Sequence, residues 1–336
     1  YYCLTHKEIE QLAIDEKETF KKYFQLTEKG NWEHGMNILY PIDTPEKFEK
    51  EHKLTNFETT LTHWRKEVLK LRKGKVKPGL DDKQNTTWNA LYLSGLCTLY
   101  AVTKEKKHGL AAQNLAQHLT NHPYSSIGEL QHIIKDGRAY QNAFLEDYAF
   151  GIQAMLDCFE TFRELQFLET AKKWTNHCFQ NLLDEKSGFF IISNQQKIVR
   201  QKVEVTDNVI PSSNSIMCKN LLKLAIITGN MDWFVHGEKM LETMQAKAIK
   251  HASFYANWCK LLFWQEKGFP YTTSKYVLEN KTPFWMNLVW QEELDSLTIF
   301  EGKNWTEESQ QIYFCKNHVC MKPVSSEKEL NEVTKD

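Results

Sequence analysis

Apolar positions along the chain recur in pairs of helices, and the two helices of a pair differ in how much of their surface is apolar. In each pair the first helix is apolar on most of its circumference, whereas the second keeps a narrow stripe. A helix that is apolar all round must be buried on both sides, so we expect the first helices to form an inner ring and the second helices an outer ring. The predicted pairs are Trp88–Val102 with Glu105–Leu119, Leu145–Phe162 with Leu165–Leu183, and Ser212–Thr228 with Met231–Ala248, followed by a helix at Ser253–Gln265.

The pairs repeat at roughly 60 residues, which is typical of stacked helical hairpins. From Pro283 the pattern changes to short strands, predicted at Phe284–Trp290, Ser296–Phe300 and Gln311–Lys316, and a terminal helix at Ser326–Val333. The pattern therefore predicts a mainly α protein. Its residues 1–282 would form an incomplete toroid of helical hairpins with an open apolar edge, and residues 283–336 a small α/β appendage packed on it.

Acidic or amide side chains stand just before the first helix of each pair. In a ring of hairpins they would meet at one end and line a polar funnel. Asp and Asn there are also ordinary helix caps, worth about 1 kcal/mol each. A cap needs only one such residue, and paired carboxylates around a sugar ring can act as acid and base. The clusters are Asp81-Asp82, Glu146-Asp147, and Asp207-Asn208 with Pro211-Ser212-Ser213-Asn214.

Charge and composition exclude several classes of partner. Lys plus Arg number 42 and Asp plus Glu 43, with no long basic run, so neither nucleic acid nor a membrane is predicted as a partner. No apolar run approaches the roughly 18 residues of a membrane span. No glycine-rich phosphate loop or zinc-protease helix is present, and no cofactor is predicted. The chain begins without Met, and we expect it to be part of something longer.

Cysteines and histidines add little chemistry at this stage. Six of the eight cysteines are scattered singly, which favours a reducing, cytoplasmic location. The remaining two, Cys315 and Cys320, are compatible with a structural, redox or metal-binding role, and a structural role is favoured because zinc needs about four ligands. No metal site is predicted. Since no histidine, His132 included, sits in a recognisable pairing, no catalytic histidine is assigned.

These motifs resemble the thioredoxin-domain-containing, spermatogenesis-associated (YyaL-type) family, in order and in spacing, over nearly the whole chain. The matching stretches are Gly30–Glu33 with Asn37–Leu39, Pro78–Lys83 with Thr87–Asn89, Phe144–Phe150, Gly188–Phe190, Pro211–Ser215, and Tyr313-Phe314-Cys315-x4-Cys320-x2-Pro323-Val324. The resemblance implies a thioredoxin-like domain followed by an (α/α)6 toroid similar to six-hairpin glycosidases and sugar epimerases. This chain has no Cys-x-x-Cys and would be the toroid portion alone, without its first hairpins.

Two functions from different classes follow from the resemblance. The first is a carbohydrate-processing or carbohydrate-binding toroid, a glycoside hydrolase or a sugar epimerase if it is an enzyme. Its acid/base or hydroxyl-binding residues would be Asp81, Asp82, Glu146, Asp147 and Asp207, and its further sugar contacts Trp32, Glu33, Trp88, Asn89, Tyr148, Ser212, Ser213 and Asn214. The alternative is a non-catalytic scaffold that presents an upstream thioredoxin-like domain of the full-length protein to partner proteins.

Overall fold

The computed structural model describes residues 1–121, 125–126, 129–194, 202–278, 285–305, 310–317 and 319–334. The chain divides into two compact units, Tyr1–Asp81 and Asp82–Asp336. This division falls inside the stretch that the sequence pattern assigned to one helical body. The boundary predicted between residues 282 and 283 stays a prediction.

The first unit is a small helical body built around one tryptophan. Its helices are α1 (His6–Glu10), α2 (Lys17–Tyr23), α3 (Pro45–Glu51) and α4 (Phe57–Lys73), with a 3-10 turn η1 at Glu33–Gly35. The Trp64 ring is fully buried and meets the rings of Phe20 and Phe57 edge-on. Edge-to-face aromatic pairs stabilise a core by more than the burial of their surface alone, so this cluster explains how a small number of residues can hold the unit together.

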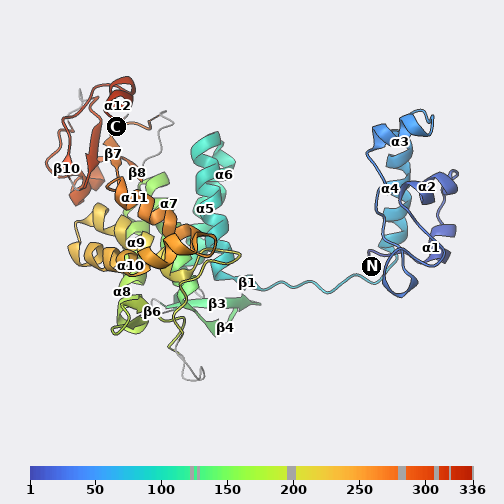
Figure 1. Ribbon diagram of the computed structural model, residues 1–336, viewed down its shortest axis with the longest axis horizontal. Helices are drawn as coiled ribbons and strands as arrows, with labels where there is room; N and C mark the ends of the chain where they lie inside the picture. The colour runs from blue at the N-terminus through green and yellow to red at the C-terminus, as the bar shows by residue number, and fades with distance from the viewer. Residues whose placement is uncertain are drawn as a thin grey trace. The chain divides into compact units, whose positions relative to one another are not determined.

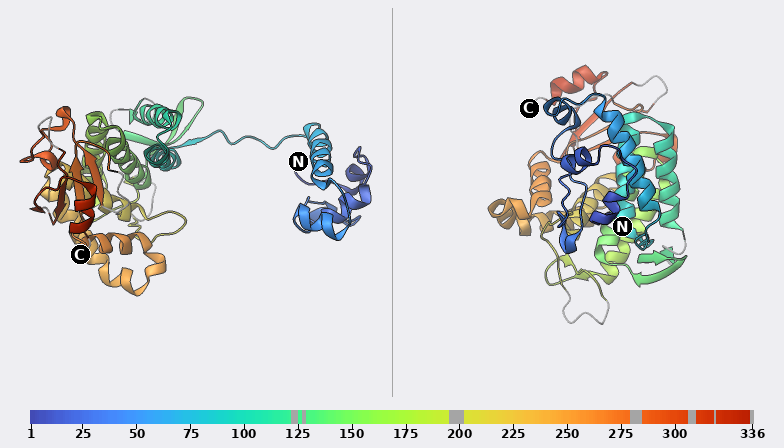
Figure 2. Two further views of the ribbon diagram at one scale, coloured as in Figure 1. Left: turned by 90° about the horizontal axis from the view of Figure 1, so that it is seen from above. Right: turned by 90° about the vertical axis from the view of Figure 1, so that its right-hand side faces the viewer.

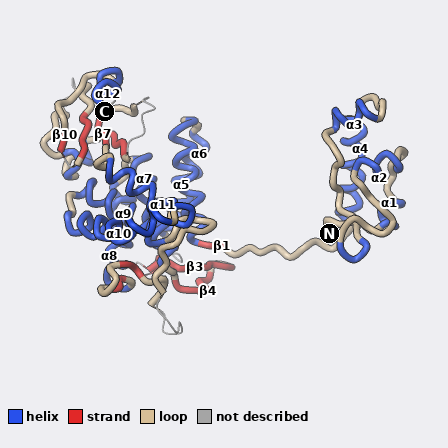
Figure 3. Tube along the Cα trace, in the orientation of Figure 1, coloured by secondary structure: helices blue, strands red, loops and turns tan. Residues whose placement is uncertain are grey.

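The second unit contains the predicted helical hairpins (Figures 1 and 3). Sequential helices separated by short turns pack side by side, α5 against α6, α7 against α8 and α9 against α10, while α7 also packs on both α5 and α9. The prediction of a mainly α hairpin toroid with a small strand-containing appendage is confirmed. The hairpins are α5 (Thr86–Thr103) with α6 (Lys106–Thr120), α7 (Leu145–Phe162) with α8 (Leu165–Asn181), and α9 (Ser213–Thr228) with α10 (Met231–Lys250), followed by α11 (Ala256–Glu266).

The inner helices are buried as their composition requires. In α9 all residues from Ser213 to Ile227 except Lys219 are buried, whereas in α10 only one stripe is. Within the second unit α5 differs, because Trp88, Tyr92 and Val102 are 73%, 62% and 78% exposed. An open apolar edge would present such side chains, and that edge stays a prediction.

A β-hairpin lies directly before α7. Strand β3 (Glu129–Lys135) pairs with β4 (Arg138–Asn142), and β3 also pairs with β1 (Gln84–Asn85) and β2 (Ser125–Ser126). The turn at Asp136-Gly137 has positive φ at both residues, as type I′ hairpins need. The sheet thus ties the start of α5 to the segment leading into α7. A second pair, β5 (Leu183–Asp184) with β6 (Phe189–Phe190), follows α8.

The C-terminal part is a four-stranded mixed sheet, in the order β10-β9-β7-β8 (Figure 2, orange to red). Strand β7 (Tyr271–Ser274) runs parallel to β8 (Met286–Val289) and antiparallel to β9 (Tyr313–Lys316), which pairs with β10 (Val319–Cys320). The sheet therefore begins before the predicted position Pro283. A 3-10 turn, η4 (Thr298–Phe300), replaces the strand predicted at Ser296–Phe300, and another, η3 (Glu292–Leu294), precedes it. Helix α12 (Glu327–Val333) follows.

Cys315 and Cys320 lie opposite each other on β9 and β10 and form a disulfide. This pairing selects the structural or redox alternatives for the two cysteines over a metal site. The other six cysteines are free. Among the described residues, no helix combines the length and the apolar content needed to cross a membrane.

Candidate functional site at the N-terminal ends of α7 and α9

Asp147 is the centre of a buried hydrogen-bond network that joins three elements. Its carboxylate is fully buried and accepts from Thr87 N (3.2 Å), Thr87 Oγ1 (2.7 Å) and Phe144 N (2.9 Å), as well as from His132. The network links the first turn of α5 to the first turn of α7. A carboxylate with every oxygen engaged and no exposed surface cannot contact a substrate. The assignment of Asp147 as an acid/base residue is therefore corrected: it is a positioning residue.

His132, on β3, is held by that carboxylate. Its Nδ1 lies 2.9 Å from Asp147 Oδ2 and 3.1 Å from Oδ1. Because an ionised carboxylate only accepts, Nδ1 carries the proton and Nε2 is left as the acceptor, which faces the Asn85 amide nitrogen at 3.4 Å. The hydrogen bond to Asp147 raises the pKa of His132, against the opposing effect of burial, and the negative charges of Asp147 and Glu146 raise it further.

This pairing corrects the expectation that no histidine has a partner. The feature that could have predicted this pairing is the register of the β3–β4 hairpin. The turn at Asp136-Gly137 places Gln131 opposite Asn142, which brings the next strand residue, His132, within reach of the start of α7.

Glu146 differs from its neighbour. Its side chain is 35% exposed, and it has no hydrogen bond among the described residues, only a 3.9 Å contact from Oε1 to His132 Nδ1. Burial raises the pKa of Glu146, and the charges of Asp147 and Glu204 raise it further while His132 opposes them. Glu146 therefore holds a proton more readily than an ordinary glutamate.

Glu146 lines a small polar cavity of about 140 Å³. Glu204 and the N-terminus of α9, with Ser212 and Ser213, complete its walls, together with residues 208–211. This volume is below the ~300–1,000 Å³ typical of drug-sized ligand sites, and none of the described residues that line the cavity is aromatic. It has room for at most one sugar ring.

His132, Glu146 and Asp147 offer ligand atoms within 4.8 Å of one another, the spacing of a metal site. Each Asp147 oxygen, however, already accepts hydrogen bonds, and His132 Nδ1 carries the proton of one of them. A metal here would have to displace both the backbone donors and the proton. The residues suit a histidine–carboxylate pair better than a metal centre.

The Asp207 cluster is another closed network. Asp207 Oδ1 accepts from Ser212 N at 2.8 Å and Oδ2 from Asn257 N at 2.8 Å, so the carboxylate caps both α9 and α11. Ser212 is the N-cap of α9, accepting from Ser215 N. Asn214 is fully buried and bonds both the N–H and the carbonyl of Phe190. Asn214 is buried and holds elements in register, which corrects its assignment as a sugar contact. Asp207, predicted as an acid/base or hydroxyl-binding residue, has both carboxylate oxygens engaged by backbone N–H groups.

The residues around α5 and its preceding segment are more dispersed. Asp82 forms an ion pair with Lys135 at 2.9 Å, on the exposed side of β3. Asn89 donates to Asn85 O at 2.8 Å within the first turn of α5. Trp88 stays exposed and free to stack, and that assignment remains a prediction.

Tyr148 does not offer a ring face. It is 3% exposed, its hydroxyl accepts from Leu130 N at 3.2 Å, and its ring stacks on His177 at 4.7 Å. Its predicted stacking role is wrong because the inner helix buries this position. In the first unit, Glu33 begins η1, Trp32 directly precedes it, and Asp81 is the last residue, so the grouping of these three with the other residues stays a prediction.

Comparison with known proteins places the chain among named relatives. It is 28% identical to human spermatogenesis-associated protein 20 over 69% of this chain and 34% of that protein, and 27% identical to the mouse protein over the same shares. The chain is therefore similar in sequence to spermatogenesis-associated protein 20. It spans about a third of the length of these relatives. A Caenorhabditis elegans protein is 26% identical over 99% of this chain and 51% of its own length. No family model matches.

Among solved structures, the chain is similar to carbohydrate-active enzymes at low identity. It matches a GH76 α-mannanase from Bacteroides thetaiotaomicron with a TM-score of 0.42 and 14% identity, over 52% of this chain and 46% of that one. It matches an unsaturated glucuronyl hydrolase specific for heparin with a TM-score of 0.42 and 12% identity, over 59% and 58%. For cellobiose 2-epimerase from Bacillus thermoamylovorans the values are 0.40 and 12%, over 56% and 55%. Likeness at this level does not identify a substrate.

Proposed function

We propose that the N-terminal ends of α7 and α9 bind a sugar and that Glu146 is the acid/base residue acting on it. The observation that carries the proposal is the contrast between adjacent carboxylates. Asp147 is fully engaged in positioning, whereas Glu146 has no hydrogen bond among the described residues, faces a cavity, and has a raised pKa. A carboxyl group with a raised pKa keeps its proton to higher pH than an ordinary glutamate, which is what general acid catalysis needs.

The chemistry follows from the two carboxylates at the cavity. In glycoside hydrolysis, Glu146 would donate its proton to the glycosidic oxygen as the C–O bond breaks, and Glu204 would take a proton from the attacking water. In epimerisation the same pair would remove and return a proton at the carbon next to a carbonyl. The cavity volume favours a monosaccharide, or the terminal residue of a longer chain. Trp88 and Asn89 remain the proposed flanking contacts.

The test is thermal shift of the full chain with a panel of mono- and disaccharides, followed by product analysis on any sugar that stabilises it. A ligand raises the melting temperature only by binding the folded state. Glu146→Gln should abolish turnover while folding normally. Glu266→Gln, an exposed glutamate on α11, is the matched control and should behave as wild type. Turnover that survives Glu146→Gln would refute the assignment.

A second candidate function is the non-catalytic scaffold for an upstream thioredoxin-like domain. The closed networks of Asp147, Asp207 and Asn214 favour it, because these side chains form hydrogen bonds with backbone groups and so hold successive hairpins in register. A scaffold predicts no stabilisation by any sugar, and retention of client proteins by the full-length protein that is lost when the toroid is removed. Reproducible stabilisation by one sugar, absent in Glu146→Gln, would contradict it.

We also propose that the protein is located in the cytoplasm. The six free cysteines support this location, and the Cys315–Cys320 disulfide weighs against it. Fractionation of cells that make the full-length protein tests this point.

A further inference from the structure

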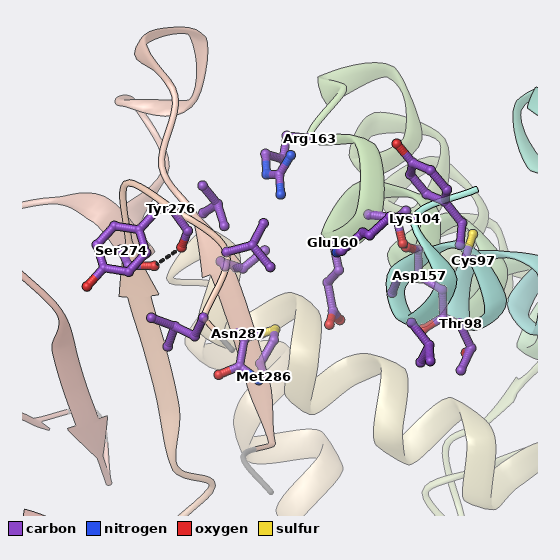
Figure 4. Close-up of a pocket in the computed structure, with 18 of the residues that line it drawn as sticks. Cys97, Thr98, Lys104, Asp157, Glu160, Arg163, Ser274, Tyr276, Met286 and Asn287 are labelled. Atoms are coloured by element: carbon purple, nitrogen blue, oxygen red, sulfur yellow. Dashed lines mark hydrogen bonds between the residues drawn. The ribbon is translucent and has the colours of Figure 1, made fainter. Parts of the chain in front are cut away.

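A second, larger cavity lies at the opposite end of α7. It measures about 610 Å³, within the range usual for small-molecule sites, and lies between the C-terminal ends of α5 and α7 and the strand β8 (Figure 4). Glu160 is 14 positions after Glu146 on α7, or about 21 Å along the helix at 1.5 Å per residue. The two cavities are therefore separate sites.

One wall of this cavity is apolar and the other carries charge. Val277, Leu278, Met286 and Leu288 line it from the sheet side. Asp157, Glu160 and Arg163 line it from α7, and Lys104 lines it from the end of α5. An apolar body with a charged end is the ligand shape that such a cavity accommodates.

The charges on the helical wall balance one another except at its rim. Glu160 forms a buried ion pair with Lys223 of α9. Lys219, one turn earlier, donates to Gln153 at 3.3 Å. Burial, and to a smaller extent the charge of Lys223, lower the pKa of Lys219 to about 8, although Asp157 and Glu160 oppose them. Glu160 is therefore paired, whereas Arg163 and Lys104 at the rim have no ion pair among the described residues.

Arg163 has no acceptor among the described residues. Its Nε is buried without a hydrogen-bond partner. Figure 4 shows its side chain pointing into the gap between β8 and the end of α7, and Glu160 pointing into the same gap. Burial lowers the pKa of Arg163, although a guanidinium stays protonated at neutral pH. The rest of the side chain is half-buried, so the one buried Nε–H lacks an acceptor that a ligand could supply.

Helix capping explains the position of Arg163 but not its unpaired nitrogen. Arg163 follows the last turn of α7 in a left-handed conformation (φ 63°), as Lys104 does after α5 (φ 57°), whereas α9 ends in Gly229. Glycine is the usual residue there, and basic side chains suit the negative end of a helix. Two basic residues at equivalent ends of neighbouring inner helices both line this cavity, and they give its rim a positive charge.

We propose that this cavity binds a small organic acid, with its carboxylate on the Arg163 guanidinium and its apolar body against Met286 and Leu288. The planar fork of arginine pairs with a carboxylate through two parallel hydrogen bonds, which suits one unpaired guanidinium at a cavity rim. This site does not depend on the proposed sugar site at the other end of α7.

The test is calorimetric titration of the full chain with three probes. The first, 3-phenylpropionate, has the charge and the apolar body; 3-phenylpropionamide has the body alone, and acetate has the charge alone. We expect 3-phenylpropionate to bind at least tenfold more tightly than either of the others. Arg163→Gln should weaken its binding at least tenfold, and Arg163→Lys, which keeps the charge but loses the fork, several-fold. Arg138→Gln, an exposed arginine on β4, is the control and should bind as wild type.

A second readout separates ligand binding from a structural role. Since Arg163→Gln removes a half-buried charge that has no ion pair among the described residues, its melting temperature without ligand should be no lower than that of wild type. The proposal is overturned if the amide binds as tightly as the acid, or if Arg163→Gln keeps wild-type affinity. It is also overturned if 3-phenylpropionate shows no binding at millimolar concentration, or if Arg163→Gln lowers the melting temperature in the absence of any probe.

Discussion

Replacing Asp147 by asparagine tests whether its buried network holds α5 and α7 together. The substitution keeps the size of the side chain but replaces one acceptor oxygen by an NH2 group. Asp147 now serves two backbone donors on opposite oxygens, Thr87 N on Oδ1 and Phe144 N on Oδ2. Whichever way the amide is placed, one of these N–H groups must face another donor.

The expected cost follows from that geometry. One buried N–H group without an acceptor costs about 1–3 kcal/mol. Loss of the charge-assisted hydrogen bond from His132 adds about 1 kcal/mol, because bonds to ionised groups are roughly twice as strong as neutral ones. We therefore expect Asp147→Asn to lower the free energy of unfolding by about 2–4 kcal/mol, a large share of the ~5–15 kcal/mol of a typical domain.

The same substitution changes the pH dependence of stability. Asp147 raises the pKa of His132 in the folded state above its ordinary value of 6.5. A raised folded pKa contributes stability that is fully present below pH 6.5 and is lost as the pH rises through the folded pKa. In Asp147→Asn this contribution disappears, so stability should fall less steeply above pH 6.5. Burial lowers the pKa values of His177 and His236, so these two histidines change the stability only below pH 6.5.

Urea unfolding of both proteins at several pH values between 6 and 9 measures these effects. Asp136→Asn, at the exposed β3–β4 turn, is the matched control and should change stability by less than about 0.5 kcal/mol. A loss below 1 kcal/mol for Asp147→Asn, or an unchanged slope of stability against pH, would refute the network.

Three further substitutions probe other parts of the fold. Glu146→Gln should raise the melting temperature above that of wild type at pH 7 and leave it equal to wild type below pH 4.5. The reason is that the pKa of Glu146 is raised in the folded protein, so its ionised form costs stability as the pH rises. Thermal scans in which the variant and wild type differ by the same amount at both pH values would contradict this. Lys223→Met should cost about 3–5 kcal/mol by leaving Glu160 buried and unpaired, whereas the double variant with Glu160→Gln should recover most of it in urea titrations; additive losses would argue against a buried pair. Replacing both Cys315 and Cys320 by serine should lower the free energy of unfolding by about 2 kcal/mol, as expected for a disulfide that closes so short a loop. The stability of this variant should equal that of wild type treated with a reductant. If the reductant also lowers the stability of the serine variant, the loss has another cause.

The helices were predictable because their information is local. The stripe at Leu145, Tyr148 and Ile152 repeats every three to four residues, and the helix observed there, Leu145–Phe162, has the predicted bounds. The same holds for the contrast between inner and outer helices, since the number of apolar faces on a helix sets how many neighbours it needs. Glu146 and Asp147 were found for a similar reason, as charged residues beside a helix with almost no polar face.

The roles of those residues depended on distant partners. Sequence placed Glu146 and Asp147 together as acid/base residues, but only the register of β3 and the packing of α5 on α7 decide that one is buried and satisfied while the other faces a cavity. His132 and Thr87 reach Asp147 from 15 and 60 positions away, and no short-range pattern encodes those distances.

Sequence by itself therefore determined the helical-hairpin fold and the end of the hairpins where polar residues gather. Tertiary structure decided which polar groups remain available: it closed Asp207 and Asn214 onto backbone donors, turned Tyr148 into the core, and left Arg163 without a counter-charge among the described residues. The physical reason is that hydrophobic periodicity fixes which face of a helix is buried, whereas the state of a buried polar group is fixed by whichever donors and charges the rest of the chain brings within about 3 Å of it.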